Sequence, residues 1–257
     1  MLHQVKVLQS VVSTLLQGGR GVTGTANPKQ PEKPLKLFDI EACPYCRRVR
    51  EVVTLLNLDV ELYPCPKNGT RYRPVAERLA GRPQFPLLID DNTGTQLLES
   101  QAIIDYLFQH YGKTGKTPRT WQQMSKFPLV QALVSGASLM RGLNAQAGNA
   151  SKTAPAQLLH LWGFEASPYS RLVRERLCEL ELPYVLHTVA KERWQDMGPA
   201  ILRLKPGKYV PVAGGKRERE LPKMQGRLQV PYLVDPNTGV QMFESKDILN
   251  YLNQTYA

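Results

Sequence analysis

One stretch of this 257-residue chain occurs twice, and the repeat limits the possible folds more than any other feature. Residues 81–100 match residues 226–245 at 12 of 20 positions without a gap. Self-similarity over such a length is typical of a chain built from copies of one structural unit. At roughly 100–200 residues per domain, the length leaves room for two units. We therefore expect two similar domains in tandem.

A second pair of matching segments lies upstream of the first. Residues 43–51, Cys-Pro-Tyr-Cys-Arg-Arg-Val-Arg-Glu, match residues 167–175, Ser-Pro-Tyr-Ser-Arg-Leu-Val-Arg-Glu, 124 positions later, whereas the first pair is 145 positions apart. The second copy therefore has an insertion of 21 residues, and the stretch 205–225, rich in Gly, Pro and charge, predicts a surface loop there. The predicted parts are an N-terminal helix and linker (1–33), a first domain (34–112), a linking helix and linker (113–157) and a second domain (158–257).

The pattern of apolar residues predicts the order β-α-β-α-β-β-α within each copy. A helix is also expected before each copy, because residues 5–17 and 128–140 are apolar at helical spacing and are followed by Arg-Gly pairs at residues 20–21 and 141–142. In the first copy the predicted strands are 35–39, 60–63, 85–90 and 96–98, and the predicted helices are 44–56, 72–79 and 101–111. The fold class is therefore α/β.

The first copy carries a Cys-x-x-Cys pair where its first strand is expected to give way to a helix. The start of a helix carries partial positive charge and free N–H donors, which stabilise a thiolate on Cys43. Pro44 suits the first helical position because its missing N–H has no partner there. We expect Cys43 to be the nucleophile, assisted by the charges of Arg47 and Arg48, and Cys46 to be the resolving thiol.

Composition and charge exclude several classes of protein. With four cysteines the chain is not a secreted disulfide scaffold, and their spacing predicts no metal site. The net charge of +11 favours anionic partners, but no long run of Lys and Arg suggests a nucleic-acid arm. No stretch of about 18 apolar residues predicts a transmembrane helix. Because residues 1–17 do not end in a signal-peptide cleavage site, we expect a cytoplasmic protein.

Cys-Pro-Tyr-Cys, followed by Phe85-Pro86 before a strand and Glu99-Ser100 before a helix, resembles glutaredoxins and the N-terminal domain of glutathione S-transferases. The resemblance covers residues 35–112 and 159–257. It implies a thioredoxin fold with glutathione as cosubstrate and a cis bond before Pro86. It also implies that Tyr45, Phe85, Pro86, Glu99 and Ser100 bind glutathione, with Ser100 and the helix N–H groups holding a carboxylate.

Two departures from that family stand out. The basic residue that the family carries just before its active cysteine is absent, and Glu41-Ala42 stand there. The all-helical domain that follows in a glutathione S-transferase is replaced by a second thioredoxin-like unit. The pocket for an electrophile that the helical domain would supply is therefore in doubt.

The second copy keeps the motif but has lost both sulfur atoms. One interpretation is that it binds glutathione, with Ser167 donating a hydrogen bond to the thiolate. The other is that it is a degenerate copy that retains only the fold. Retained binding would use Ser167, Tyr169, Val230, Pro231, Glu244 and Ser245.

Three functions remain open from the sequence. The leading one is a glutathione-dependent thiol–disulfide oxidoreductase that acts on disulfides. The second is a glutathione transferase that acts on an electrophile. The third is a binding module without activity, which would present the basic stretch 205–227 to a partner. The helix near residues 129–140 is expected to pack on its own domain, with a homodimer contact as the alternative.

Overall fold

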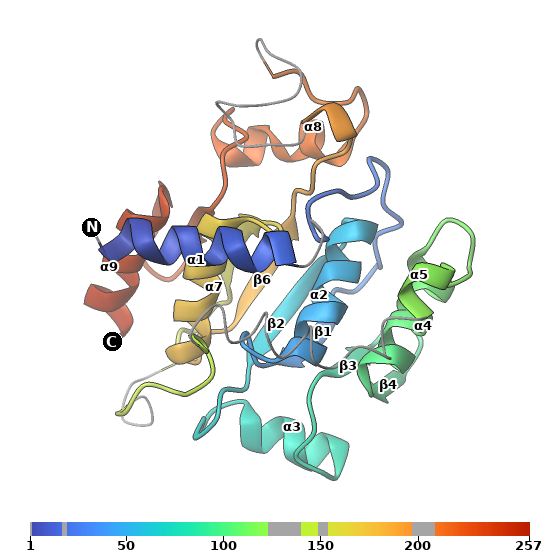
Figure 1. The fold of residues 1–257 in the computed structure, drawn as a ribbon. Helices are drawn as coiled ribbons and strands as arrows, with labels where there is room; N and C mark the ends of the chain where they lie inside the picture. The colour runs from blue at the N-terminus through green and yellow to red at the C-terminus, as the bar shows by residue number, and fades with distance from the viewer. Residues whose placement is uncertain (1, 17–19, 123–139, 149–153, 197–208) are drawn as a thin grey trace.

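The computed structural model of the chain describes residues 2–16, 20–122, 140–148, 154–196 and 209–257 (Figure 1). The first domain comprises β1 (Leu35–Asp39), α2 (Pro44–Leu56), β2 (Asp59–Pro64), α3 (Arg73–Ala80), β3 (Leu87–Asp90), β4 (Thr95–Leu98) and α4 (Ser100–Tyr111). The second comprises β5 (Leu159–Gly163), α7 (Pro168–Glu179), β6 (Tyr184–Thr188), β7 (Tyr232–Asp235), β8 (Val240–Phe243) and α9 (Ser245–Tyr256). The other elements are α1 (Leu2–Leu16), α5 (Arg119–Gln122), η3 (Trp194–Asp196), α8 (Lys216–Glu220) and η4 (Pro222–Met224).

The predicted fold class is confirmed, and the elements around the cysteines agree best with the prediction. Strand β1 and helix α2 have the bounds expected from the sequence. Helix α2 begins at Pro44 and ends at Leu56, and the left-handed backbone of the capping residue Asn57 (φ 55°) stops the helix. Strand β3 begins at Leu87, two residues later than predicted, so that the Phe85-Pro86 pair lies outside the sheet ladder.

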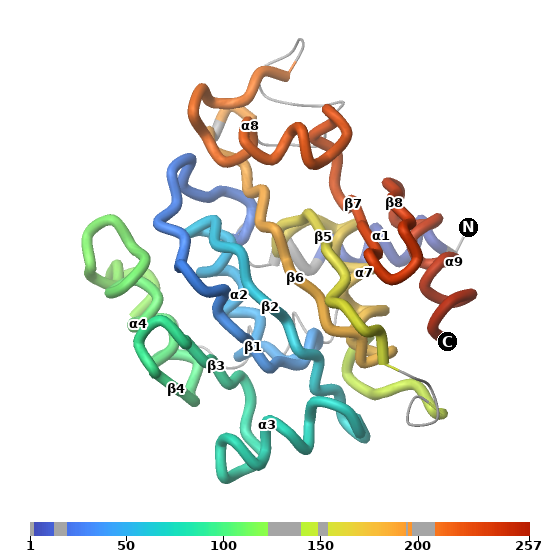
Figure 2. Tube along the Cα trace, turned by 180° about the vertical axis from the view of Figure 1, so that it is seen from behind, coloured from blue at the N-terminus to red at the C-terminus, as the bar shows by residue number. Residues whose placement is uncertain are grey.

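The two domains share one sheet. The strand order is β4-β3-β1-β2-β6-β5-β7-β8, so the edge strands β2 and β6 pair across the domain boundary (Figure 2). They run antiparallel, with Asp59 opposite His187 and Leu62 opposite Tyr184. Because an unpaired edge strand exposes a row of backbone donors and acceptors, each domain protects the edge of the other. The domains are therefore joined by backbone hydrogen bonds as well as by side chains.

A single apolar core runs beneath both halves of the sheet. It lies between the strands and helices α2, α4, α7 and α9, and it continues without a break across the pairing of β2 with β6. Burying large aliphatic side chains stabilises a fold by roughly 1.5–3 kcal/mol each. Its fully buried members include Leu37, Val53, Leu62, Ile104, Leu107, Leu161, Val173, Leu177, Leu233 and Ile248.

Buried charges join the domains on the helix side of the sheet. Arg50 in α2 pairs with Glu165 of the second domain at 3.0 Å, and Arg174 in α7 pairs with Glu41 of the first, also at 3.0 Å. These four residues are equivalent in the sequence repeat, so the two contacts exchange partners about an approximate two-fold axis. Arg174 also reaches Glu165 at 3.0 Å, and Asp39 hydrogen-bonds Arg50. All five side chains are nearly inaccessible to solvent.

The predicted surface loop in the insertion is only partly correct. Residues 205–208 lie outside the described part of the chain, but α8 and η4 pack onto the second domain. Lys216 is buried, donates to the backbone oxygen of Asn57 at 2.8 Å and forms an ion pair with Asp59. Met224 is fully buried beside Trp162. The described part of the insertion therefore forms short helices that contact both domains.

Two other expectations cannot be compared with the structure over their full length. The helix predicted near residues 128–140 lies outside the described residues except for Met140, and so does most of the linker 148–155. In the part of the chain that is described, no helix is both long and apolar enough to cross a membrane.

Candidate functional site

The sheet topology gathers three sequence-predicted segments at one edge of the first domain. Strands β1 and β4 run in the same direction because each pairs antiparallel with β3. The helices that follow them, α2 and α4, therefore begin at the same edge, where β3 also begins. Cys43 stands before α2, Phe85-Pro86 before β3, and Glu99-Ser100 at the start of α4. The same relations hold in the second domain.

Cys43 occupies the residue that caps the N-terminus of α2. Its backbone is extended (φ −73°, ψ 125°), and its carbonyl accepts the N–H of Arg47 at 3.0 Å, which begins the helical ladder. The Cys43 side chain is partly accessible, whereas Cys46 is fully buried and accepts the N–H of Ile40 at 3.5 Å. Both are free thiols. The arrangement leaves one sulfur open to a substrate and holds the other behind it.

The two thiols of this pair differ in acidity. A hydrogen bond from Cys46 lowers the pKa of Cys43 to about 7, against the effect of burial, and the N–H groups of Cys46 and Tyr45 also lower it. Burial raises the pKa of Cys46, and its hydrogen bond to Cys43 raises it further. At neutral pH a large fraction of Cys43 is therefore thiolate while Cys46 keeps its proton. This is the order of reactivity that a nucleophile and a resolving thiol require.

The positive charge near Cys43 differs from the charge expected from the sequence. Arg50, further along α2, is the cation that lowers the Cys43 pKa. Arg47 turns to the domain boundary, where it lies 3.5 Å from Glu165. Arg48 donates to Gln101 at 2.9 Å. Arg50 therefore adds to the stabilisation of the Cys43 thiolate, while the interface between the domains engages Arg47.

The Phe85–Pro86 peptide bond is cis, as the resemblance implies. Phe85 packs against a small apolar cluster centred on Phe38 and Ile40, and Cys43 packs against the same cluster. The guanidinium of Arg73 lies 5.0 Å from the centre of the Phe85 ring. The cluster therefore brings the segment before β3 and the reactive thiol to one apolar wall.

The Glu99-Ser100 pair forms the other end of the site. Glu99 has a left-handed backbone (φ 70°), makes no side-chain capping bond, and accepts a hydrogen bond from Gln84. Ser100 is the buried first residue of α4, and among the described residues its hydroxyl has no hydrogen-bond partner. The side chain of Tyr45, in the first turn of α2, is half exposed. An ordinary helix cap therefore does not explain the Glu99 side chain.

The serine copy reproduces the site without its sulfur atoms. Ser167 caps α7 and is almost fully buried, and the Ser170 hydroxyl donates to the Ser167 oxygen at 2.9 Å. The Val230–Pro231 bond is cis, like its counterpart in the first domain. Tyr169 is half exposed, like Tyr45.

The glutamate and serine of the second site also keep their geometry. Glu244 has a left-handed backbone (φ 65°) and accepts a hydrogen bond from Gln229. Ser245 is buried, and its hydroxyl lies 3.2 Å from Nε2 of His3 in α1. The two sites therefore differ in their sulfur atoms, in the burial of the residue that caps the helix (Cys43 partly accessible, Ser167 buried) and in this contact with the N-terminal helix.

Leu143 belongs to the apolar wall of the first site, although the sequence pattern does not predict it there. It packs against the same cluster as Cys43 and Phe85. Its carbonyl accepts the N–H of Lys67 at 2.7 Å, which ties the segment between the domains to the first domain. The repeated Arg-Gly pair is the sequence signal that could have pointed to Leu143. Leu143 directly follows Arg141-Gly142, and Val22, which packs in the same cluster as Val230, directly follows Arg20-Gly21.

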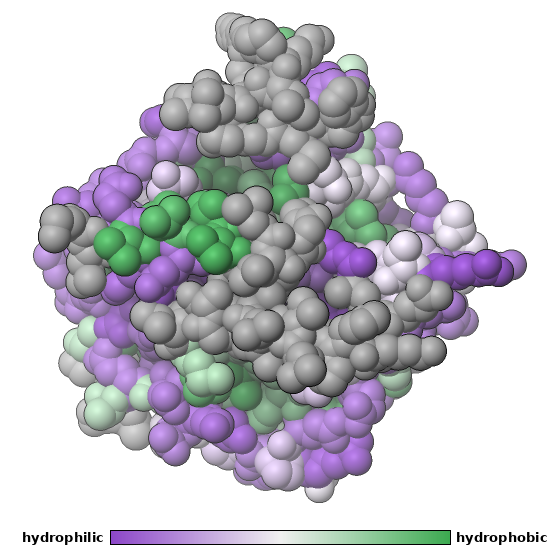
Figure 3. Space-filling model, viewed as in Figure 1, coloured by the Kyte–Doolittle hydropathy of each residue, from purple (hydrophilic) through white to green (hydrophobic). Residues whose placement is uncertain are grey.

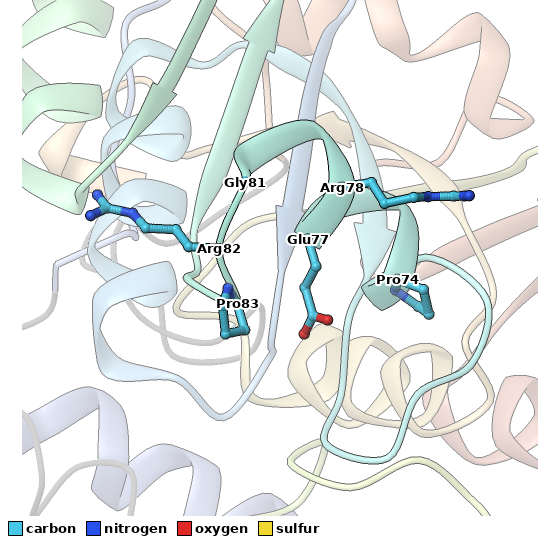
Figure 4. Close-up of a pocket in the computed structure, with 6 residues that line it drawn as sticks. All are labelled: Pro74, Glu77, Arg78, Gly81, Arg82 and Pro83. Carbon is cyan, nitrogen blue, oxygen red and sulfur yellow. The ribbon is translucent and has the colours of Figure 1, made fainter.

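An open hollow of about 520 Å³ lies next to the first site. It is lined by Pro74, Glu77, Arg78, Gly81, Arg82 and Pro83, at the end of α3 (Figure 4). Cys43 does not line the hollow. The hollow borders the site through Arg82, whose guanidinium lies 3.6 Å from the Glu99 carboxylate. Within the described ranges, no three His, Cys, Asp or Glu side chains are grouped to hold a metal ion.

Comparison with known proteins identifies both halves of the chain. The sequence model for the glutathione S-transferase N-terminal domain matches residues 37–116 and again residues 161–257. Among solved structures, a trimeric glutathione transferase, TDR1 of Leishmania, is 13% identical, with a TM-score of 0.27 over 88% of this chain and 67% of its own. That likeness is too weak to support a conclusion about this chain. No curated protein matches.

Proposed function

Because the chain belongs to the glutathione S-transferase N-terminal domain family in both of its halves, we propose that it is a glutathione-dependent thiol–disulfide oxidoreductase. The observation that carries the proposal is the pairing of Cys43, partly accessible with a pKa lowered to about 7, with the buried, protonated Cys46. Groups whose pKa is strongly shifted by a specific partner cluster at functional sites, and this pair of thiols is such a case.

The proposed reaction is a series of thiol–disulfide exchanges. The Cys43 thiolate attacks one sulfur of a disulfide substrate, forms a mixed disulfide, and releases the other sulfur as a thiolate that takes up a proton. In the first route Cys46 attacks the Cys43 sulfur and releases the remaining substrate sulfur as a thiol, and two glutathione molecules then reduce the Cys43–Cys46 disulfide in two further exchanges. In the second route a glutathione thiolate attacks the Cys43 sulfur, releases the remaining substrate thiol and leaves glutathione on Cys43. A second glutathione thiolate then attacks the glutathionyl sulfur, which frees Cys43 and forms glutathione disulfide. In both routes the substrate gains two electrons, and two glutathione molecules become one glutathione disulfide.

Glutathione is proposed to lie along the edge where α2, β3 and α4 begin. The backbone of Phe85, before cis Pro86, would pair with its cysteinyl part, as the resemblance implies. The Ser100 hydroxyl and the N–H groups of α4 would hold the γ-glutamyl carboxylate, for which the helix N-terminus is favourable. Glu99, with Tyr45 at the open side, would face the ammonium group. The second domain is proposed to bind glutathione without reacting.

The two other functions have less support. A transferase would need a place for an electrophile, and the hollow of Figure 4 is not lined by the reactive thiol. A binding module that uses the basic stretch 205–227 would need its cations exposed. Arg219, Lys223 and Arg227 are exposed, but Lys216 and Arg217 are buried, and Lys216 is held by Asp59. Part of the basic charge is therefore used inside the protein, and the hollow lies away from the thiol, so the oxidoreductase has the stronger support.

The pH dependence of alkylation tests the proposal directly. The rate at which iodoacetamide modifies Cys43 is expected to be half-maximal near pH 7, because the pKa of Cys43 is lowered to about 7 and only the thiolate reacts. Mass spectrometry of the peptide that carries Cys43 gives the rate at each pH. An unreactive binding module predicts a midpoint near pH 8.5, the value of an ordinary cysteine. A midpoint there would refute the proposed role of Cys43.

A further inference from the structure

We infer that α1 is a lid over the second glutathione site, and that glutathione enters this site only after the helix moves away. The inference rests on the proposed function, because it takes the second domain to be a glutathione site. Helix α1 precedes the first domain in sequence but lies across α7 and reaches α9, both in the second domain (Figure 1). Its position therefore makes access to the second domain depend on a segment from the start of the chain.

The N-terminal segment meets the second site at three places. At the carboxylate end, Nε2 of His3 lies 3.2 Å from the Ser245 hydroxyl. Midway, the guanidinium of Arg171, one turn beyond Ser167, donates to the carbonyl of Ser10 at 3.3 Å. At the end where the glutathione sulfur would lie, next to Ser167, the carbonyl of Gly21 accepts the N–H of Ala166 at 3.0 Å. His3, Ser10 and Gly21 therefore lie along the site from one end to the other.

His3 forms a hydrogen bond with the Ser245 hydroxyl, the group that the glutathione carboxylate would bind. In the first domain, the hydroxyl of the equivalent Ser100 has no partner among the described residues. In the second, His3 occupies the hydroxyl. Burial lowers the pKa of His3, and Lys246 and Lys6 lower it further, so the imidazole is neutral at pH 7.

A carboxylate is a better partner for this place than a neutral imidazole. A hydrogen bond to a charged group is roughly twice as strong as one between two neutral groups. The cations that disfavour a charged His3, Lys246 and Lys6, would attract a carboxylate, and so would the N-terminus of α9. Glutathione therefore competes with His3 for one hydroxyl.

The helix is held along a narrow strip. Over residues 3–12, Val7 is the one buried apolar side chain, and Ser10 is buried beside it. Val5, Leu8 and Val12 are 48%, 63% and 43% exposed, and Figure 3 shows a hydrophobic patch over α1. Since apolar burial is the main force that holds a surface helix, this strip contributes modestly over these residues. Weak apolar packing of this kind would let α1 cover the second site and also move away from it.

The test counts the ligand molecules that one chain binds. S-methylglutathione is titrated calorimetrically into the full chain, because its blocked sulfur cannot react with Cys43. Wild type is expected to bind about one equivalent tightly, and a His3→Ala, Val7→Lys variant about two, because the competing contacts are gone. His3→Ala alone, a milder change, is expected to strengthen binding at the second site several-fold. The matched control Leu8→Ala changes the exposed face of α1 and should behave as wild type.

Each outcome has a distinct meaning. Adding Ser245→Ala to the loosened variant should remove the extra equivalent, which assigns it to the second site. Two equivalents in wild type, or one equivalent in both wild type and the loosened variants, would overturn the lid while leaving the first site intact. No binding in any variant would refute the proposed function together with the lid.

Discussion

Replacing Cys43 with serine is expected to slow the reduction of a glutathione mixed disulfide by at least about 1000-fold. The thiolate is the attacking group in disulfide exchange, and a serine hydroxyl is not ionised near neutral pH. The backbone around residue 43 should not change, because serine caps the equivalent helix α7 at residue 167. The rate is followed spectroscopically, with glutathione reductase and NADPH consuming the glutathione disulfide formed.

The control for this prediction is Cys178→Ser, which also removes one thiol. Burial raises the pKa of Cys178, and its thiol donates to the carbonyl of Gly142 at 3.2 Å, a bond that a serine hydroxyl can also make. The control should therefore keep the wild-type rate. Equal rates for wild type and the Cys43 variant would show that Cys43 is not the nucleophile.

Replacing Glu165 with glutamine is expected to lower the free energy of unfolding by roughly 3–5 kcal/mol, the cost of removing one partner from a buried charge cluster. Burial by itself would raise the pKa of Glu165, but the guanidinium groups of Arg174, Arg50 and Arg47 lower it to about 2. Glutamine keeps the shape of the side chain and removes the charge, so these buried cations lose a shared partner. Urea unfolding measured by circular dichroism gives the difference.

An exposed ion pair provides the control for the Glu165 variant. Lys36 and Asp91 are 2.6 Å apart but partly exposed, so Asp91→Asn should cost less than about 1 kcal/mol. The effect of Glu165 should also depend on pH. Its folded pKa lies below the ordinary value of 4.5, so its contribution is present above pH 4.5 and is lost as the pH falls toward 2. A cost below about 1 kcal/mol at pH 7 would show that the cluster does not hold the domains together.

Local signals in the sequence were sufficient for the fold of each domain. Apolar periodicity and the proline at the first helical position define β1 and α2, and the repeat extends these assignments to the second copy. The repeat also selected the segments that the sheet brings to one edge. Short-range signals of this kind depend on neighbouring residues, which the sequence shows directly.

The pairing of the two domains could not be predicted in the same way. The sequence of strand β2 does not indicate that its edge pairs with β6, because backbone groups form these hydrogen bonds whatever the side chains are. The charges of the cluster are visible in the repeat as Glu41 and Arg50 with their counterparts Glu165 and Arg174, but the sequence pattern does not indicate that they are buried. Burial at the domain boundary decides their role, and it depends on contacts between residues more than 100 positions apart. The same holds for α1, whose apolar spacing predicts a helix but not the domain that it covers.

The most direct test of the central claim is to trap glutathione on the first site. In a Cys46→Ser variant, oxidised glutathione should transfer one glutathionyl group to Cys43, because the thiolate displaces glutathione and no resolving thiol releases the adduct. Intact mass spectrometry and peptide mapping should show a single adduct on the peptide that carries Cys43, and a reductant should remove it. An unmodified Cys43, or modification only at Cys65 or Cys178, would contradict the assignment of Cys43 as the glutathione-reactive thiol.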